Sequence, residues 1–203
     1  PHLGGDCRLS SSRLFLHPSV FLRIGVFMGK KKKIKKKHSP KSQPRTKTLT
    51  SSLIVPKVLI TPNVQETIQN ECCLTGQFET GGLLLGERKK VSGRYTLIIR
   101  VATGPGDLAV HGYDYFIPDV DHYKKELRFF LYQHGLVYLG EWHKHPGMFN
   151  SPSCTDMDTM REIVNGDESE DLIVGIATTF SFNGSDDLGK TVNTDFYYFK
   201  AGM

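Results

Sequence analysis

Cysteine is scarce in this chain, and its spacing fits neither a disulfide framework nor a cysteine-based metal site. The 203 residues contain 4 cysteines, and no CxxC pair occurs. Cys72 and Cys73 are adjacent in the sequence and cannot easily bridge each other. We therefore expect reduced thiols and a cytoplasmic location.

Long hydrophobic runs are also absent. No stretch of about 18 uninterrupted apolar residues occurs, so we expect no transmembrane helix. Residues 14–27 are rich in apolar side chains, but His17, Pro18 and Arg23 interrupt them. A lysine cluster follows this run instead of preceding it, which is the wrong order for a signal peptide. Met28 offers an alternative first residue, in which case residues 1–27 are upstream sequence and not native protein.

Acidic residues are missing from the segment that follows. Ten Lys or Arg and no acid lie between Met28 and Leu49, and residues 1–27 add three Arg and one Asp. The net charge of +5 therefore divides into a basic arm and a remainder, residues 50–203, of about −7. We predict that residues 1–52 form a disordered basic tail, because their lysine-rich part cannot bury enough apolar surface to fold.

Two interpretations of this tail remain open. Its lysines, concentrated in residues 30–37, suit an arm for nucleic acid or an acidic partner. They equally suit a solubilising tail. No aromatic residue interleaves the lysines, which weakens the case for stacking on bases.

Residues 53–203 have the length and pattern of one folded domain. Apolar residues at helical spacing predict helices near 62–76, 119–135 and 155–164. Apolar runs between glycine-rich breaks predict strands near 57–61, 82–86, 95–101, 136–145, 172–178 and 194–200. Because helices and strands mix along the chain, the sequence predicts an α/β or α+β layered fold.

The segment GEWHKHPGMFNSPSCTD, residues 140–156, carries the candidate chemistry. Side chains alternate along a strand, so His143 and His145 point to one face and can converge on one ion. Asp156 lies in the first turn of the next predicted helix and can reach the same ion. Two histidines and one carboxylate, with a fourth position for water, form the ligand set of a catalytic zinc. One zinc per chain would lower the pKa of that water from about 15.7 to roughly 7.

Two further residues complete the predicted catalytic set. A carboxylate must take the proton of the water and pass it to the leaving amine, and Glu79 is the candidate. It precedes the glycine pair of the buried segment ETGGLLLG, where Gly81 and Gly82 permit close backbone approach. Ser153 is near enough to Asp156 to hydrogen-bond a developing oxyanion.

Each residue also has a simpler interpretation. The two histidines can be ordinary half-buried side chains, and Glu79 can be a solvated acid at a strand edge. Ser153 and Asp156 form a helix-capping pattern that needs no metal. Glu141 is two residues before His143 on the same predicted strand, so its side chain points to the same face as the two histidines. It is therefore the rival of Glu79 as general base or ligand.

Together these residues resemble the JAMM/MPN+ (JAB domain) metalloprotease family. Its pattern is a Glu, a long gap, His-x-His-Pro, six residues, Ser, two residues and Asp. Glu79, the segment 143–146, Ser153 and Asp156 match every position. The surrounding ETGGLLLG, ATGPG, GEWHKHPG and SPSCTD look most like the prokaryotic branch. Lys144 and Cys154 occupy variable positions, and we expect Cys154 to be a buried structural thiol.

The resemblance covers about residues 53–203 and implies a three-layer fold with a mixed sheet flanked by helices. It implies zinc ligation by His143, His145 and Asp156, with Glu79 as general base and acid and Ser153 as oxyanion donor. The activity it implies is hydrolysis after the C-terminal glycine of ubiquitin or a ubiquitin-like protein. Similar prokaryotic enzymes are encoded beside E1-like and E2-like proteins in anti-phage operons, including CBASS.

Two other functions remain as alternatives. A non-catalytic MPN-type scaffold would bind partners without hydrolysis, although such relatives lose ligands and none is missing here. A zinc nuclease would use the lysine-rich tail, but the acidic charge of the folded part disfavours a phosphate substrate.

Overall fold

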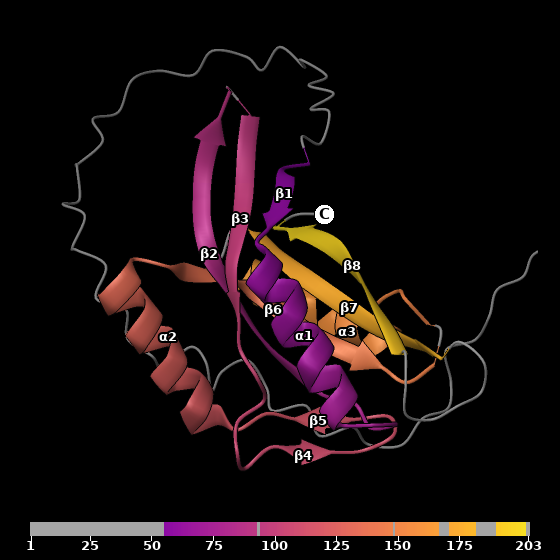
Figure 1. The fold of residues 1–203 in the computed structure, drawn as a ribbon. Coiled ribbons are helices and arrows are strands. Elements are labelled where there is room, and N and C mark those ends of the chain that lie inside the picture. Colours follow the sequence, from indigo (N-terminus) through magenta and orange to yellow (C-terminus); the bar gives the residue numbers. More distant parts are fainter. Residues whose placement is uncertain (1–54, 93, 148, 167–170, 182–189, 202–203) are drawn as a thin grey trace, which may run out of the picture.

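The computed structural model describes residues 55–92, 94–147, 149–166, 171–181 and 190–201. The predicted basic tail lies outside these ranges. The elements, shown in Figure 1, are β1 (Lys57–Ile60), α1 (Pro62–Leu74), β2 (Gly81–Val91), β3 (Arg94–Ala102), β4 (Val110–His111), β5 (Phe116–Ile117), α2 (Val120–His134), β6 (Val137–His145), α3 (Cys154–Asn165), β7 (Asp171–Ser181) and β8 (Lys190–Lys200).

Six strands form one mixed sheet in the order β1-β3-β2-β6-β7-β8. The β1–β3 and β6–β7 pairs are parallel, and the β2–β3, β2–β6 and β7–β8 pairs are antiparallel. The β6 strand, which carries the candidate histidines, therefore lies inside the sheet between β2 and β7. Pairing on both edges fixes its backbone, which suits a strand that must hold side chains in register.

Helix α1 covers one face of the sheet (Figure 1). Its residues Val64, Ile68 and Cys72 recur at helical spacing and are completely buried. They pack in one cluster with side chains of β3, β6, β7 and β8. Burying an aliphatic side chain of this size contributes roughly 1.5–3 kcal/mol. The sequence pattern thus predicted both the helix and its buried face.

Helices α2 and α3 pack against the opposite face. Met160 and Val164 of α3 lie in a cluster with β7 and β8 residues, and Tyr123 of α2 packs on Leu83 and Leu85 of β2. The sheet is therefore enclosed between α1 on one side and α2 with α3 on the other. This confirms the predicted α+β class and its layered arrangement.

Alternation along β6 separates two sets of side chains. Trp142 belongs to the cluster under α1, and its indole N–H donates to the carbonyl of Thr103 over 3.0 Å. Lys144 is also completely buried on this side, where its Nζ donates to Cys72 O at 3.1 Å and Gly76 O at 2.9 Å. The intervening histidines face the layer of α2 and α3.

Two features differ from the sequence predictions. The two-residue strands β4 and β5 pair as a small hairpin before α2, where no strands were predicted. Two residues are too few to show periodicity, which explains the omission. Cys154 is exposed, so the prediction of a buried thiol is wrong. It occupies the first position of α3, where only part of the helix faces the core.

Among the described residues, no helix is long and apolar enough to span a membrane.

Candidate metal centre

Both histidines owe their orientation to the pairing of β6. His143 lies opposite Gly81 of β2 and beside Ile176 of β7, and His145 lies beside Thr178 of β7. Because His143 and His145 are two residues apart on a continuous strand, their rings point to the same side. Their centroids are 4.8 Å apart. The predicted convergence of the two rings is therefore present.

Asp156 reaches the histidines from the start of α3. Ser153 is the N-cap of this helix, and its Oγ accepts from the backbone N–H of Asp156 at 3.2 Å. In return, Oδ2 of Asp156 accepts from the backbone N–H of Ser153 at 2.7 Å. This capping box confirms the simpler interpretation of the Ser-x-x-Asp pattern. It also fixes the carboxylate in place, so capping and metal binding are compatible.

Three potential ligand atoms meet at this point. Nε2 of His143 lies 2.9 Å from Nε2 of His145, and Oδ2 of Asp156 lies 3.4 Å and 3.3 Å from these two atoms. Ligands placed 2.0–2.1 Å from a tetrahedral zinc would be separated by about 3.3 Å. Among the described residues this is the group of His, Cys, Asp and Glu side chains that can hold a metal ion.

The tautomer of His145 is compatible with a cation at this point. Its Nδ1 lies 3.0 Å from the backbone carbonyl of Phe149. A carbonyl only accepts, so Nδ1 carries the hydrogen and Nε2 of the neutral ring presents a lone pair. That lone pair faces Nε2 of His143 and a carboxylate oxygen of Asp156, so a proton or a metal ion among these atoms would stabilise the group.

The charges at this point perturb both groups. Burial alone would lower the pKa of His145, but the hydrogen bond and charge of Asp156 outweigh it and raise that pKa, with smaller effects from Phe149 and Glu79. Burial alone would raise the pKa of Asp156, yet the two histidines hold it far below its ordinary value. The carboxylate is therefore ionised and available as a ligand, with 5% of its surface exposed.

Glu79 lies in the loop between α1 and β2, immediately before the strand that pairs with the histidines. Lys144 donates its backbone N–H to Thr80 O at 2.7 Å, which extends the β2–β6 pairing toward Glu79. Glu79 is two residues before Gly81, which pairs with His143. Because side chains alternate along an extended chain, Glu79 is expected on the same face as the histidines. Its effect on the pKa of His145 is consistent with a carboxylate near the ligand group.

Glu141, the rival acid, is held in a different environment. Its Oε1 accepts a hydrogen bond from the hydroxyl of Tyr138 at 3.1 Å. Burial raises the pKa of Glu141, partly offset by this hydrogen bond and the charge of His143. A β-bulge near Gly140 lets Tyr138 and Glu141 face the same side although they are three residues apart. Glu141 does not belong to the group of ligand atoms.

The glycine pair before the buried strand is required by close packing. A Cβ at Gly81 would collide with the carbonyl oxygen of Trp142 and lie 2.9 Å from Phe116 and 3.1 Å from the Cβ of His143. A Cβ at Gly82 would collide with the carbonyl of Thr103. The close backbone approach predicted from the sequence is therefore confirmed.

Sequence reasoning missed two contacts that support the site. The carbonyl of Phe149, which fixes the tautomer of His145, lies in a loop without any pattern. The β4–β5 hairpin contacts Glu79 through His111 and Gly112. The only local signal there was Gly112 after His111, which is compatible with a turn. It does not indicate which segment the hairpin contacts.

The fold and the site define a class of protein: an α+β domain in which two histidines and one carboxylate form a group that could hold a metal ion, beside a glutamate-bearing loop. The family model described as prokaryotic homologs of the JAB domain matches residues 61–185. The chain belongs to this family.

Two curated relatives carry the name CD-NTase/cGAS isopeptidase. The protein from Enterobacter hormaechei subsp. hoffmannii is 32% identical over 116 residues, which are 57% of this chain and 63% of that protein. The protein from Escherichia coli is 30% identical over 127 residues, 62% of this chain and 75% of that protein. The alignment with the Enterobacter protein thus spans less than two thirds of its length.

Among solved structures, a solution structure of a Desulfitobacterium hafniense protein matches with a TM-score of 0.47 and 15% identity. The match covers 71% of this chain and 90% of that one.

Proposed function

We propose that this chain is a zinc-dependent isopeptidase that cleaves after the C-terminal glycine of a ubiquitin-like modifier. The observation that carries the proposal is the meeting of His143, His145 and Asp156 within hydrogen-bond distances of one another. Family membership and the similarity to two isopeptidases support the same activity.

Each residue has a role in this proposal. His143, His145 and Asp156 hold the metal, which when bound supplies Lewis-acid polarisation of the scissile carbonyl and acidifies a water molecule. Glu79 takes a proton from the attacking water and delivers it to the leaving amine as the C–N bond breaks. The products are the free carboxylate of the modifier and the amine of its target.

Ser153 has a second role beside helix capping. Its Oγ accepts the N–H of Asp156, so the hydroxyl keeps its own hydrogen for donation. In the proposed reaction, the hydroxyl donates this hydrogen to the oxyanion that forms at the scissile carbonyl.

The names of the relatives suggest the target. We infer that the substrate is a CD-NTase carrying an isopeptide-linked ubiquitin-like modifier, and that the chain acts in a bacterial anti-phage conjugation system with E1-like and E2-like partners. Precursor processing of the modifier uses the same bond and the same residues. The nuclease alternative depends on the tail outside the described residues, and the scaffold alternative does not explain the assembled ligand group.

The test uses purified full-length protein. We expect about one zinc per chain by elemental analysis and cleavage of a ubiquitin-like fusion just after its terminal glycine. Glu79→Gln should retain zinc and its melting temperature while losing at least ~10²–10⁴-fold in kcat, the contribution of a positioned base. A metal-free wild type that hydrolyses no modifier would instead favour the scaffold. Normal cleavage by Glu79→Gln would remove Glu79 from its role.

A further inference from the structure

The position of Glu79 raises a structural problem, because no strand of the main sheet contains it. Helix α1 ends at Leu74 and β2 begins at Gly81. Gly81 and Gly82 follow it, and glycine restricts the backbone less than any other residue. A catalytic carboxylate must be held closely, since a displacement of about 1 Å can reduce the rate about 10²-fold. Contacts outside the sheet can add to the support that the bond between Lys144 and Thr80 gives this residue.

The β4–β5 hairpin supplies two such contacts. The backbone N–H of Glu79 donates to Gly112 O at 2.7 Å. The backbone carbonyl of Glu79 lies 2.8 Å from Nδ1 of His111. Because a carbonyl only accepts, Nδ1 of His111 is the donor. Figure 1 shows the hairpin beside the C-terminal end of α1, where the loop carrying Glu79 begins.

The arrangement departs from an ordinary antiparallel pair in an informative way. Two residues that are hydrogen-bonded across such a pair exchange both N–H···O bonds. Glu79 donates to Gly112, but the N–H of Gly112 donates to Tyr115 O at 2.9 Å, closing the hairpin. The N–H of Gly112 is thus used within the hairpin, and the ring of His111 donates to the carbonyl of Glu79.

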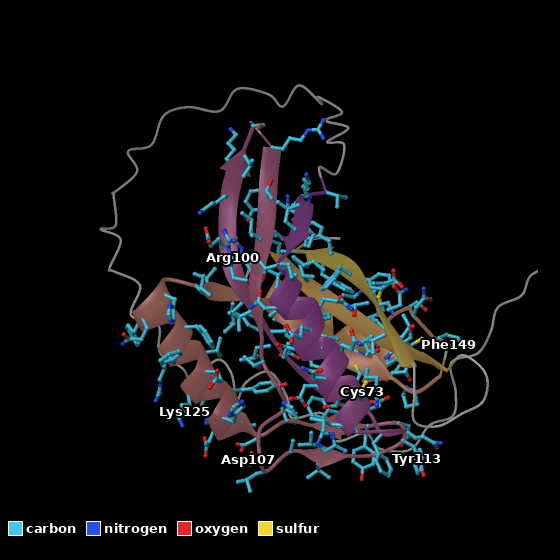
Figure 2. The ribbon with its side chains drawn as sticks, viewed as in Figure 1. Cys73, Arg100, Asp107, Tyr113, Lys125 and Phe149 are labelled. Atoms are coloured by element: carbon cyan, nitrogen blue, oxygen red, sulfur yellow. The ribbon has the colours of Figure 1, made fainter. Side chains whose placement is uncertain are left out.

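Neighbouring side chains hold the ring of His111 in this orientation. It stacks on Phe116 of β5, with centroids 5.6 Å apart and an interplanar angle of 28°. The ring of Phe78, next to Glu79, packs on the ring of Tyr113, with centroids 4.8 Å apart. This contact joins the loop to the hairpin a second time. Figure 2 labels Tyr113 at the lower right of the view, at the same end of the molecule as the hairpin.

We propose that His111 is a positioning residue for catalysis, because its ring N–H holds the backbone carbonyl of Glu79 and so fixes the carboxylate beside the metal ligands. This inference rests on the proposed function, in which Glu79 is the general base and acid. His111 touches neither substrate nor metal ligands in this role. It acts through the backbone of Glu79.

Two substitutions separate hydrogen bonding from packing. His111→Phe keeps a ring to stack on Phe116 but has no donor. His111→Asn loses the ring, while its Nδ2 can occupy the place of Nδ1 and donate. We expect kcat of His111→Phe to fall about 10- to 100-fold with KM nearly unchanged. We expect His111→Asn to retain most of kcat. Both should bind zinc and melt as the wild type does.

The matched controls are His134→Phe and His134→Asn on the exposed last turn of α2, which should leave kcat unchanged. Should His111→Phe fail to fold, His111→Leu takes its place as the variant without a donor. The opposite order, with Phe active and Asn impaired, assigns a packing role and overturns the proposal, as does full activity of both donor-free variants.

A second measurement does not depend on turnover. Amide hydrogen exchange of Glu79 should be faster in His111→Phe than in wild type and near the wild-type rate in His111→Asn. An unchanged rate in His111→Phe overturns the positioning role of His111. If wild type cleaves no modifier while this pattern holds, the proposed function fails and the hydrogen bond stands. If wild type is active and the pattern is absent, only the role of His111 fails.

Discussion

Gly81 of β2 lies directly opposite His143 of β6, and the side chain that glycine lacks would collide with the backbone of Trp142. This pairing sets the distance between the loop of Glu79 and the two histidines. It explains why a glycine is required beside the candidate metal centre and provides the first prediction.

Gly81→Ala should weaken zinc binding. The new Cβ would lie 3.1 Å from the Cβ of His143 and 2.9 Å from Phe116, so the strands must separate and the imidazole must move. Substitutions that disturb the support of a metal ligand typically reduce affinity about 10- to 100-fold. Competition with a chromogenic chelator measures this change. Gly166→Ala is the matched control, because its Cβ would meet nothing closer than 3.4 Å.

Ser153 can be tested for both of its roles by comparing two substitutions. Ser153→Ala removes the cap and should destabilise the protein by about 1 kcal/mol, whereas glycine at an N-cap costs only about a few tenths. Both remove the hydroxyl and should lower kcat by about 10²–10³-fold if it stabilises the oxyanion. Thermal melts and kcat of the two variants distinguish the effects. Wild-type turnover by Ser153→Gly would leave capping as the only function.

Lys144→Met should destabilise the fold, although Lys144 is not one of the candidate metal ligands. Lys144 is buried and donates to Cys72 O, Gly76 O and, at 2.9 Å, to Oγ1 of Thr75. Leaving a buried acceptor without a donor costs roughly 1–3 kcal/mol, which the removal of a buried charge only partly offsets. Chemical denaturation measures the change.

The control for this variant is Lys124→Met. Lys124 pairs with the exposed Asp121 across one turn of α2 at 3.1 Å. Exposed pairs of this kind contribute about 0.3–0.5 kcal/mol. Equal losses in the two variants would contradict the structural role assigned to Lys144.

Zinc binding should compete with a proton on His145. The pKa of His145 in the metal-free protein is raised, because Asp156 outweighs the effect of burial. A raised folded-state pKa contributes stability that is complete below about 6.5, the ordinary value, and is lost as pH rises through the folded value. The lowered pKa of Asp156 contributes stability lost only under acid as pH falls through its folded value, outside this range.

The stabilisation by zinc should therefore increase with pH from about 5.5 to 8, because fewer protons must be displaced. Thermal melts of chelated and zinc-loaded protein across this range measure the gap in unfolding free energy between the two forms. This gap is roughly 2.7 kcal/mol when zinc is at 100 times its Kd. His134→Ala should show the same trend. A gap independent of pH would argue against histidine ligands.

Local rules of the chain determined much of the site. The spacing of His143 and His145 on a strand is sufficient to place both rings on one face, because strand side chains alternate. The Ser-x-x-Asp pattern likewise fixes Asp156 in the first turn of a helix. The amphipathic pattern of Val64, Ile68 and Cys72 defined the buried face of α1. Each depends on residues close together in the sequence.

The sequence by itself thus determined the candidate ligand residues, the helices and the class of fold. Only the tertiary structure decided how Glu79 is held, because β2 reaches β6 by a long-range pairing that no local pattern specifies. The β4–β5 hairpin and the hydrogen bond of His111 to Glu79 were likewise decided there. Two-residue strands have no periodicity to detect, and a donor for a backbone carbonyl is identified only when the folded chain brings both groups within reach.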